Sequence, residues 1–285
     1  MPKLVIIVIC MLFAIDSHAS CTQTKQFIDY SLAKYCDTAK ITFVLIDGSD
    51  ALSAESRSWI STNVFGDKNL THFNDRGGRF SVSVLKDSGV ANMEVNSVCS
   101  PTPMSKINLF TEAPNKVKAA NKKYDCAIDH LRDTSLGQSF GARKSLIIEA
   151  VEEIFTSPKY EMKEVDGPRK FILVSDLFQN SSVLNFHKLC TKYDRVISAC
   201  QNCPKSKIKS TACPTYSQII GHKSGVGKYL KTATPKLRTS DEVYIYNTNV
   251  RGRVDESAHD FWREFFIEAG VDENNIIIQS ELVHH

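Results

Sequence analysis

The sequence has almost no excess of charge of either sign. Its 35 Lys and Arg residues nearly balance its 32 Asp and Glu residues, which leaves a formal net charge of +3. Because nucleic-acid-binding proteins carry concentrated positive charge, this balance excludes nucleic acid as an expected partner. The sequence also lacks internal repeats and low-complexity tracts. Its hydrophobic content of 42% is typical of a globular chain that buries a core.

Motifs of nucleotide-binding proteins and phosphatases are missing as well. Asp47 is followed two residues later by Ser49, so the second aspartate of a haloacid dehalogenase phosphatase is absent. The glycine-rich stretch 221–229 lacks the spacing of a phosphate loop, and Tyr229 stands where such a loop has its magnesium-binding hydroxyl. We therefore expect no nucleotide ligand.

No apolar run in the sequence is long enough to span a membrane. The longest, residues 4–15, has about a dozen residues, whereas a spanning helix needs roughly 20. Lys3 precedes this run and a small-x-small cleavage pattern ends at Ala19, so we expect residues 1–20 to be a signal peptide. Two alternatives stay open. The run could be a short membrane anchor, or Cys21 could carry a lipid, since the residues before it match half of a bacterial lipobox.

The cysteines are even in number once the signal peptide is removed. They are Cys21, Cys36, Cys99, Cys126, Cys190, Cys200, Cys203 and Cys213. An even number in an oxidising compartment favours disulfides, and closeness in the chain favours the pairs Cys21–Cys36 and Cys99–Cys126. A zinc site around the Cys-x-x-Cys motif at 200–203 is the alternative. Zinc sites more often use two such close pairs, and here the flanking cysteines are isolated.

Strand-like and helix-like segments alternate along the chain. Strands are expected at residues 41–46, 79–85, 170–175, 242–246 and 276–278, and helices at 53–64, 144–155 and 257–269. Such alternation predicts a mostly parallel sheet covered by helices on both faces. We expect residues 21–285 to form one domain, a three-layer, Rossmann-like α/β sandwich. Residues 88–126 and 190–213 are expected to be disulfide-containing insertions, the first of them irregular in structure.

Acidic and hydroxyl side chains lie where the central strands end. Asp47 and Asp176 each follow an apolar strand, Ser49 lies two residues beyond the first acid, and Ser145 lies at the start of an expected helix. Ligands of parallel α/β sheets bind outside the carboxyl ends of the strands, so these four side chains are the candidate site. Their oxygen-only chemistry suits magnesium, manganese or calcium, with positions left open for an acidic group of a partner.

These residues resemble the metal-ion-dependent adhesion site of von Willebrand factor A (VWA) domains. That site has the pattern Asp-x-Ser-x-Ser, then a Thr, then an Asp. Asp47 and Ser49 match its start, Ser145 would replace the threonine, and Asp176 matches the last acid. Ala51 stands at the position of the second serine, so one ligand is missing.

Three phrases resemble, more narrowly, an exported bacterial branch of VWA-like proteins. They are residues 45–53 (Leu-Ile-Asp-Gly-Ser-Asp-Ala-Leu-Ser), 175–181 (Ser-Asp-Leu-Phe-Gln-Asn-Ser) and 261–266 (Phe-Trp-Arg-Glu-Phe-Phe). The resemblance covers residues 41–278 outside the two insertions. It implies a periplasmic or secreted, non-enzymatic module of adhesion or scaffold type. Such a module would bind a protein partner through Mg²⁺ or Mn²⁺, and it would contact a membrane only if Cys21 carries a lipid.

Metal-free interpretations of the same residues stay open. Acids at strand ends often cap helices or bind loop amides, and Asp50 or Ser53 could simply cap the helix expected at 53–64. The chain would then be a structural subunit of an envelope assembly, with the two insertions as its contact surfaces. A metal-dependent hydrolase is the least supported alternative, because no nucleophile or general base is evident beside the acids.

Overall fold

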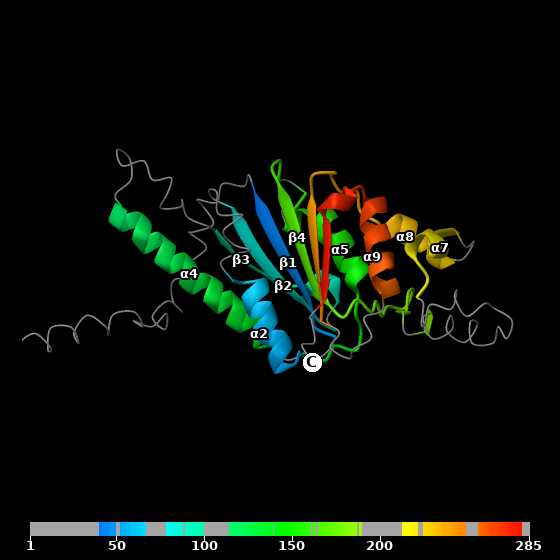
Figure 1. The fold of residues 1–285 in the computed structure, drawn as a ribbon, viewed down its shortest axis with the longest axis horizontal. Helices are drawn as coiled ribbons and strands as arrows, with labels where there is room; N and C mark the ends of the chain where they lie inside the picture. Colours follow the sequence, from blue (N-terminus) through cyan, green and yellow to red (C-terminus); the bar gives the residue numbers. More distant parts are fainter. Residues whose placement is uncertain are drawn as a thin grey trace, which may run out of the picture.

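A six-stranded sheet forms the centre of the molecule (Figure 1). The computed structural model describes residues 40–49, 52–66, 78–87, 89–99, 114–138, 140–160, 162–163, 165–186, 188–189, 213–221, 225–248 and 256–280. The strands are β1 (Ile41–Asp47), β2 (Arg79–Leu85), β3 (Val95–Cys99), β4 (Arg169–Ser175), β5 (Glu242–Asn247) and β6 (Ile276–Ser280). Their order is β3-β2-β1-β4-β5-β6. β3 runs antiparallel to β2, and every other neighbouring pair is parallel, which confirms the predicted mostly parallel sheet.

Helices cover both faces of this sheet (Figure 1). On one face lie α2 (Ala54–Asn63) and α4 (Pro114–Leu136); on the other lie α5 (Ile147–Thr156), α7 (Tyr216–Gly221), α8 (Gly225–Ala233) and α9 (Glu256–Ala269). Short 3₁₀ turns are η4 (Val90–Asn92), η6 (Pro158–Tyr160) and η8 (Glu273–Asn275). The central strands β1 and β4 are buried along their whole length, as expected for parallel strands covered on both sides. The predicted three-layer α/β sandwich is therefore confirmed.

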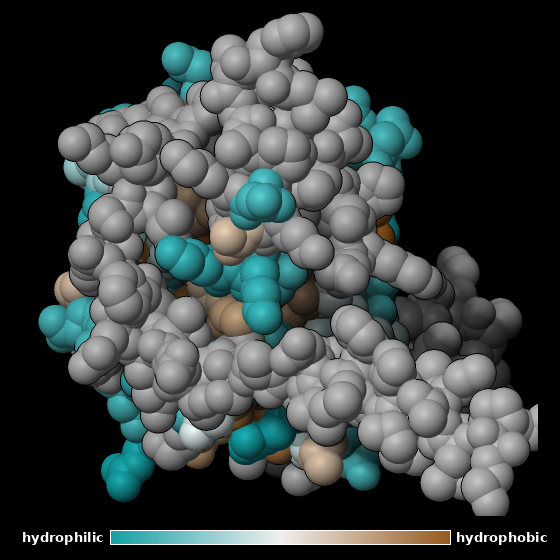
Figure 2. Space-filling model, turned by 90° about the vertical axis from the view of Figure 1, so that its left-hand side faces the viewer, coloured by the Kyte–Doolittle hydropathy of each residue, from teal (hydrophilic) through white to brown (hydrophobic). Residues whose placement is uncertain are grey.

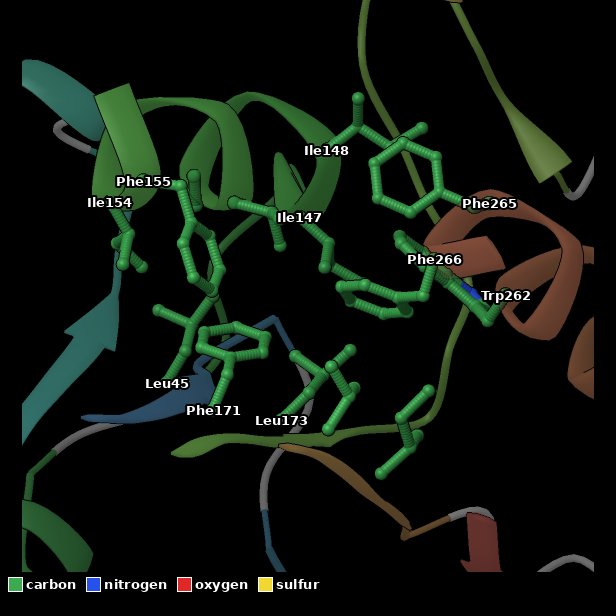
Figure 3. Packing of buried hydrophobic residues seen from close by; sticks show 14 of the residues in the cluster. Leu45, Ile147, Ile148, Ile154, Phe155, Phe171, Leu173, Trp262, Phe265 and Phe266 are labelled. Carbon is green, nitrogen blue, oxygen red and sulfur yellow. The ribbon is translucent and has the colours of Figure 1, made fainter. Parts of the chain in front are cut away.

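Aromatic and aliphatic side chains fill the layer between the sheet and helices α5 and α9 (Figure 3). Trp262, Phe265 and Phe266 of α9 pack beside Ile147 and Ile148 of α5, and all five are fully buried. These α9 aromatics are core residues, as the sequence indicated. The helix ends at Ala269 and is followed by Gly270, whose φ of 113° is a backbone conformation that favours glycine.

The expectation that residues 88–125 are irregular is wrong for the described residues 89–99 and 114–125. This stretch contains the edge strand β3 and the first half of α4, a helix of 23 residues that extends past the sheet (Figure 1). Three prolines suggested a loop, but Pro114 is the first residue of α4, where its missing N–H costs no helical hydrogen bond. Helices α7 and α8 were also missed. Two glycines in α8, Gly225 and Gly227, weaken its helical pattern.

The structure describes only some of the residues predicted to form disulfides, and it does not describe the predicted signal peptide. Cys99, Cys126 and Cys213 are disulfide-bonded. The pairing of Cys99 with Cys126 stays a prediction, although β3 and α4, which carry them, pack together. The other five cysteines of the mature chain (Cys21, Cys36, Cys190, Cys200 and Cys203), the signal peptide and residues 190–212 lie outside the described residues.

The last two features of the fold concern membrane-spanning helices and the hydropathy of the surface. None of the helices in the described ranges combines the length and apolarity needed to cross a bilayer. On the side of the molecule seen in Figure 2, the described residues that reach the surface are mostly hydrophilic.

Candidate functional site

Two of the predicted site residues, Asp47 and Ser145, are in direct contact at the carboxyl edge of the sheet. Strands β1 and β4 run parallel with Ile46 beside Val174, so Asp47 and Ser175 come next on neighbouring strands. The Asp47 Oδ2 atom accepts hydrogen bonds from the hydroxyls of Ser145 (2.7 Å) and Ser175 (2.9 Å). Asp47, Ser145 and Ser175, which we name the Asp47 cluster, thus join three separate segments of the chain.

The Asp47 carboxyl group is buried and held by neutral donors. Its residue is 5% exposed, and its Oδ1 atom accepts a third hydrogen bond from the backbone N–H of Ser49 at 3.0 Å. Burial raises the pKa of Asp47, and the hydrogen bonds from Ser145, Ser49 and Ser175 partly oppose that rise. The ion pairs formed within the described part of the chain involve other carboxylates. A negative charge at Asp47 therefore has no cation beside it there.

Glycine is needed directly after Asp47. The Gly48 N–H donates to the carbonyl oxygen of Leu85 at 3.1 Å, and a Cβ at Gly48 would lie 2.4 Å from that same oxygen. Any other residue would push β1 and β2 apart at the point where Asp47 and Ser49 must turn. The Asp47-Gly48-Ser49 sequence is thus explained by packing as well as by side-chain chemistry.

Backbone hydrogen bonds fix the segment that carries Ser145. The N–H groups of Gly141 and Ala142 donate to the Gly48 carbonyl at 2.8 and 2.9 Å. Ser145 then forms an isolated antiparallel bridge with Asn180, with N···O distances of 3.2 and 2.8 Å. The expected helix at 144–155 begins at Ile147, so Ser145 lies before the helix. Its hydroxyl is free for Asp47 because it does not cap the helix.

Gln179 caps α5 in place of a local residue. Its side-chain oxygen accepts from the N–H of Ile148 at 3.0 Å, and its amide nitrogen donates to Glu149 at 2.7 Å. Leu146, the residue at the capping position, has no side chain that can do this. Gln179 thereby ties the loop after β4 to the start of α5.

Asp176 lies at the same edge, one residue beyond the Asp47 cluster. It is half-buried, and its Oδ1 atom accepts the N–H of Phe178 at 2.9 Å. The next residue, Leu177, has a φ of 69°, a left-handed conformation that is uncommon for leucine. Two hydrogen bonds hold it there: its N–H donates to the Ser175 hydroxyl at 2.9 Å, and its carbonyl accepts the Trp262 indole N–H at 3.0 Å.

The structure therefore separates the four predicted residues into two kinds. Asp47 and Ser145 bond directly through their side chains. Ser49 donates to Asp47 through its backbone N–H and also interacts with it through its side chain, whereas Asp176 directly follows Ser175 in the chain. Asp50 and Ala51 lie outside the described residues. The predicted cap is confirmed for Ser53, whose hydroxyl accepts the Ser56 N–H at 3.0 Å.

Ser175 was missed as a member of the site. The sequence did contain a signal for Ser175, because this residue ends an apolar strand, β4, that neighbours the strand of Asp47, β1. In parallel strands such residues share an edge.

A Gly-x-Ser-x-Gly pattern, the signature of many serine hydrolases, occurs at residues 137–141. In those enzymes the serine lies on a sharp turn between a strand and a helix. Here the pattern follows helix α4, which ends at Leu136, and leads into the segment before α5. Ser139 itself lies outside the described residues. The order of elements therefore differs from that of a nucleophile elbow.

The oxygen atoms at this edge suit a hard divalent cation if serine hydroxyls as well as carboxylates coordinate it. Among the described residues, no group of three or more Asp, Glu, His or Cys side chains is placed to hold a metal, so hydroxyls must supply part of the coordination. Asp47 already accepts three hydrogen bonds through both oxygens. It therefore fits the role of an acceptor that orients hydroxyl ligands, while Ser49, Ser145 and Asp176 fit the role of direct ligands.

Comparison with known proteins gives weak likenesses only. No family model and no curated protein matches the chain. One similar solved structure is the pilus adhesin SpaC from Lactobacillus rhamnosus GG in an open conformation, with a TM-score of 0.38 and 10% identity over 86% of this chain and 28% of that chain. Another is the human COPII-coat protein Sec24c, with a TM-score of 0.36 and 11% identity over 87% of this chain and 31% of that one. The chain thus spans less than a third of either protein, and the likeness concerns the fold alone.

Proposed function

We propose that this chain is a non-enzymatic protein-interaction module of adhesion or scaffold type. Its carboxyl sheet edge would bind a carboxylate of a protein partner through Mg²⁺ or Mn²⁺, in the periplasm or outside the cell. The main support is the Asp47 cluster: a buried carboxylate, held by hydroxyls from two other segments, at the edge where parallel α/β sheets bind ligands. The resemblance of the same residues to a VWA adhesion site agrees with it.

The division of roles follows from the hydrogen bonds. Ser145 donates its hydroxyl proton to Asp47, which leaves the oxygen lone pairs of Ser145 available to a cation. Ser49 and Asp176 are both partly exposed and lie on the loops that follow β1 and β4. A cation held by Ser49, Ser145 and Asp176 would have Asp47 behind it as a compensating charge. Its remaining positions would be open to water or to the carboxylate of a partner.

A metal-free structural subunit of an envelope assembly is the second candidate, and one observation favours it. Both oxygens of Asp47 accept hydrogen bonds from the chain itself, and Ser145 and Ser175 are only 1% and 2% exposed. A cluster so enclosed could serve only to join β1, β4 and the segment before α5. In that case the contact surface would lie elsewhere, for example on the part of α4 that extends past the sheet (Figure 1).

Calorimetric titration of the mature chain, residues 21–285, with Mg²⁺ and Mn²⁺ separates the two candidates. The sharpest variant is Asp176→Asn, which keeps an oxygen to accept the Phe178 N–H but removes the charge. Asp272→Asn is its matched control, because Asp272 accepts the N–H of Asn274 in the same way, also at 2.9 Å, before β6 at the opposite edge.

A saturable heat that weakens at least about tenfold in Asp176→Asn and stays unchanged in Asp272→Asn supports the cation site. Absence of heat with either metal, together with an unchanged melting temperature, would reject the metal-bridged function. It would leave the structural subunit as the better account.

A further inference from the structure

A small polar hollow lies between β2, β3 and the last turn of α4. Its empty volume is about 440 Å³ including the open mouth. Val82 and Val84 of β2, 1% and 7% exposed, give it an apolar floor, and the buried Ser135 of α4 adds a hydroxyl. The other residues that line the hollow are polar or charged, so hydrogen bonds and charge would dominate recognition there.

One buried atom in this hollow lacks a hydrogen-bond partner. Among the buried side-chain oxygen and nitrogen atoms of the described residues, the side-chain oxygen of Gln138 is the one without a donor. Buried acceptors are nearly always satisfied, because burying one without a donor is unfavourable. The Gln138 oxygen can therefore accept a hydrogen bond from a donor that enters the hollow.

Two opposite charges lie at the same hollow. Glu94 and Lys86 both line it, and both residues are exposed. A carboxylate and an unsatisfied amide oxygen that line the same hollow both favour a cationic donor such as an ammonium group. The Lys86 ammonium favours an anionic group on the same ligand. The pair would therefore recognise a molecule that carries both charges.

We propose that this hollow binds a small zwitterionic α-amino acid. Its ammonium group donates to the Gln138 oxygen and to Glu94, its carboxylate pairs with Lys86, and its short apolar side chain rests on Val82 and Val84. The hollow shares no residue with the Asp47 cluster or with the proposed cation ligands, so variants can test the two sites separately. It can hold or fail whatever the outcome of the metal titration.

Calorimetry or ligand-detected NMR with L-alanine, propionate and ethylamine tests the proposal on the mature chain. Propionate lacks the ammonium group and ethylamine lacks the carboxylate, so each is expected to bind at least about tenfold more weakly than alanine. Glucose, a neutral molecule rich in hydroxyls, serves as the probe for unspecific hydrogen bonding. Equal binding of ethylamine and alanine, preferential binding of glucose, or no binding of any probe would overturn the proposal.

Variants then assign the binding to the hollow. Gln138→Leu removes the buried acceptor, and Glu94→Gln removes the charge of an exposed residue with little risk to folding; each is expected to weaken alanine binding at least about tenfold. Gln279→Leu, at an exposed glutamine of β6, is the matched control and should bind alanine like the natural chain. Unchanged alanine affinity in Glu94→Gln rejects the site even if Gln138→Leu fails to fold.

Discussion

The two ends of the sheet each bury an aspartate, and they stabilise it in opposite ways. At the amino edge, Asp241 precedes β5 and is 1% exposed, while Arg169 opens β4 and is 4% exposed. The Arg169 guanidinium donates to both oxygens of Asp241, through Nε at 2.7 Å and through a second nitrogen. At the carboxyl edge, Asp47 is 5% exposed and has only hydroxyl and backbone donors.

The comparison of Asp241 with Asp47 shows which of the two buried carboxyl groups lacks a neighbouring cation among the described residues. Arg169 also donates to the carbonyl of Met162 at 2.8 Å and lies over the ring of Phe155 at 5.4 Å, so its buried charge is paired with Asp241 and further hydrogen-bonded. Asp47 has no such cation among the described residues, and burial therefore raises its pKa. Groups perturbed in this way gather at functional sites, which agrees with the proposal of a binding site at the carboxyl edge.

The largest expected effect comes from breaking the amino-edge pair. Arg169→Met leaves Asp241 buried without its cation, so we expect the free energy of unfolding to fall by about 3–5 kcal/mol. Arg132→Met is the matched control. Arg132 pairs with Asp129 and Asp133, whose side chains are 50% and 69% exposed, and surface pairs contribute about 0–1 kcal/mol. Urea denaturation measures both. Equal losses in the two variants would mean that Arg169 acts as a surface residue and that the contrast between the two edges is false.

The elements that sequence could reveal are those with a continuous local pattern. β1 and β4 were predicted because unbroken apolar runs ending in an acid are typical of buried parallel strands, and α9 because Phe261, Trp262 and Phe265 repeat at helical spacing. The start of α4 could not be predicted from the sequence, because a proline such as Pro114 occurs in the first turn of a helix as well as in loops.

The two buried aspartates show the same limit at the level of single residues. Asp47 stood out because it ends an apolar strand. The partners Arg169 and Asp241 are 72 residues apart in the chain, and nothing in either local sequence indicates that they meet. Ser175 is an intermediate case. The sequence shows it beside Asp176 at the end of an apolar strand, but only the pairing of β1 with β4 shows that it donates a hydrogen bond to Asp47.

A second, smaller effect tests whether backbone strain is stored at the carboxyl edge. Leu177 is fully buried with a φ of 69°, so both Leu177→Ala and Leu177→Gly lose the core side chain, but only glycine relieves the left-handed conformation. We expect the glycine variant to be the more stable of the two by about 1 kcal/mol. The same pair at Leu173, within β4, should show the reverse order by about 0.5–1 kcal/mol, because glycine weakens an ordinary strand. Thermal and urea unfolding measure both pairs, and the same order at both positions would rule out strain at Leu177.

The smallest expected effect is a change with pH at Asp47. The folded pKa of Asp47 lies above its ordinary value of about 3.9, so between these two values the folded chain holds a proton that the unfolded chain has lost. The contribution of Asp47 to stability therefore falls as pH rises through this window and stays low above it. Asp47→Asn has no such proton. The unfolding free energy of the variant minus that of the natural chain should thus increase from pH 4 towards neutrality, measured by urea denaturation in a chelating buffer. Parallel curves of unfolding free energy against pH for the two proteins would show that the hydrogen bonds to Asp47 already offset the burial of its negative charge.

Adding Mg²⁺ extends the comparison. A cation bound beside Asp47 would compensate its negative charge, so Mg²⁺ should reduce the difference in unfolding free energy between Asp47→Asn and the natural chain near neutral pH.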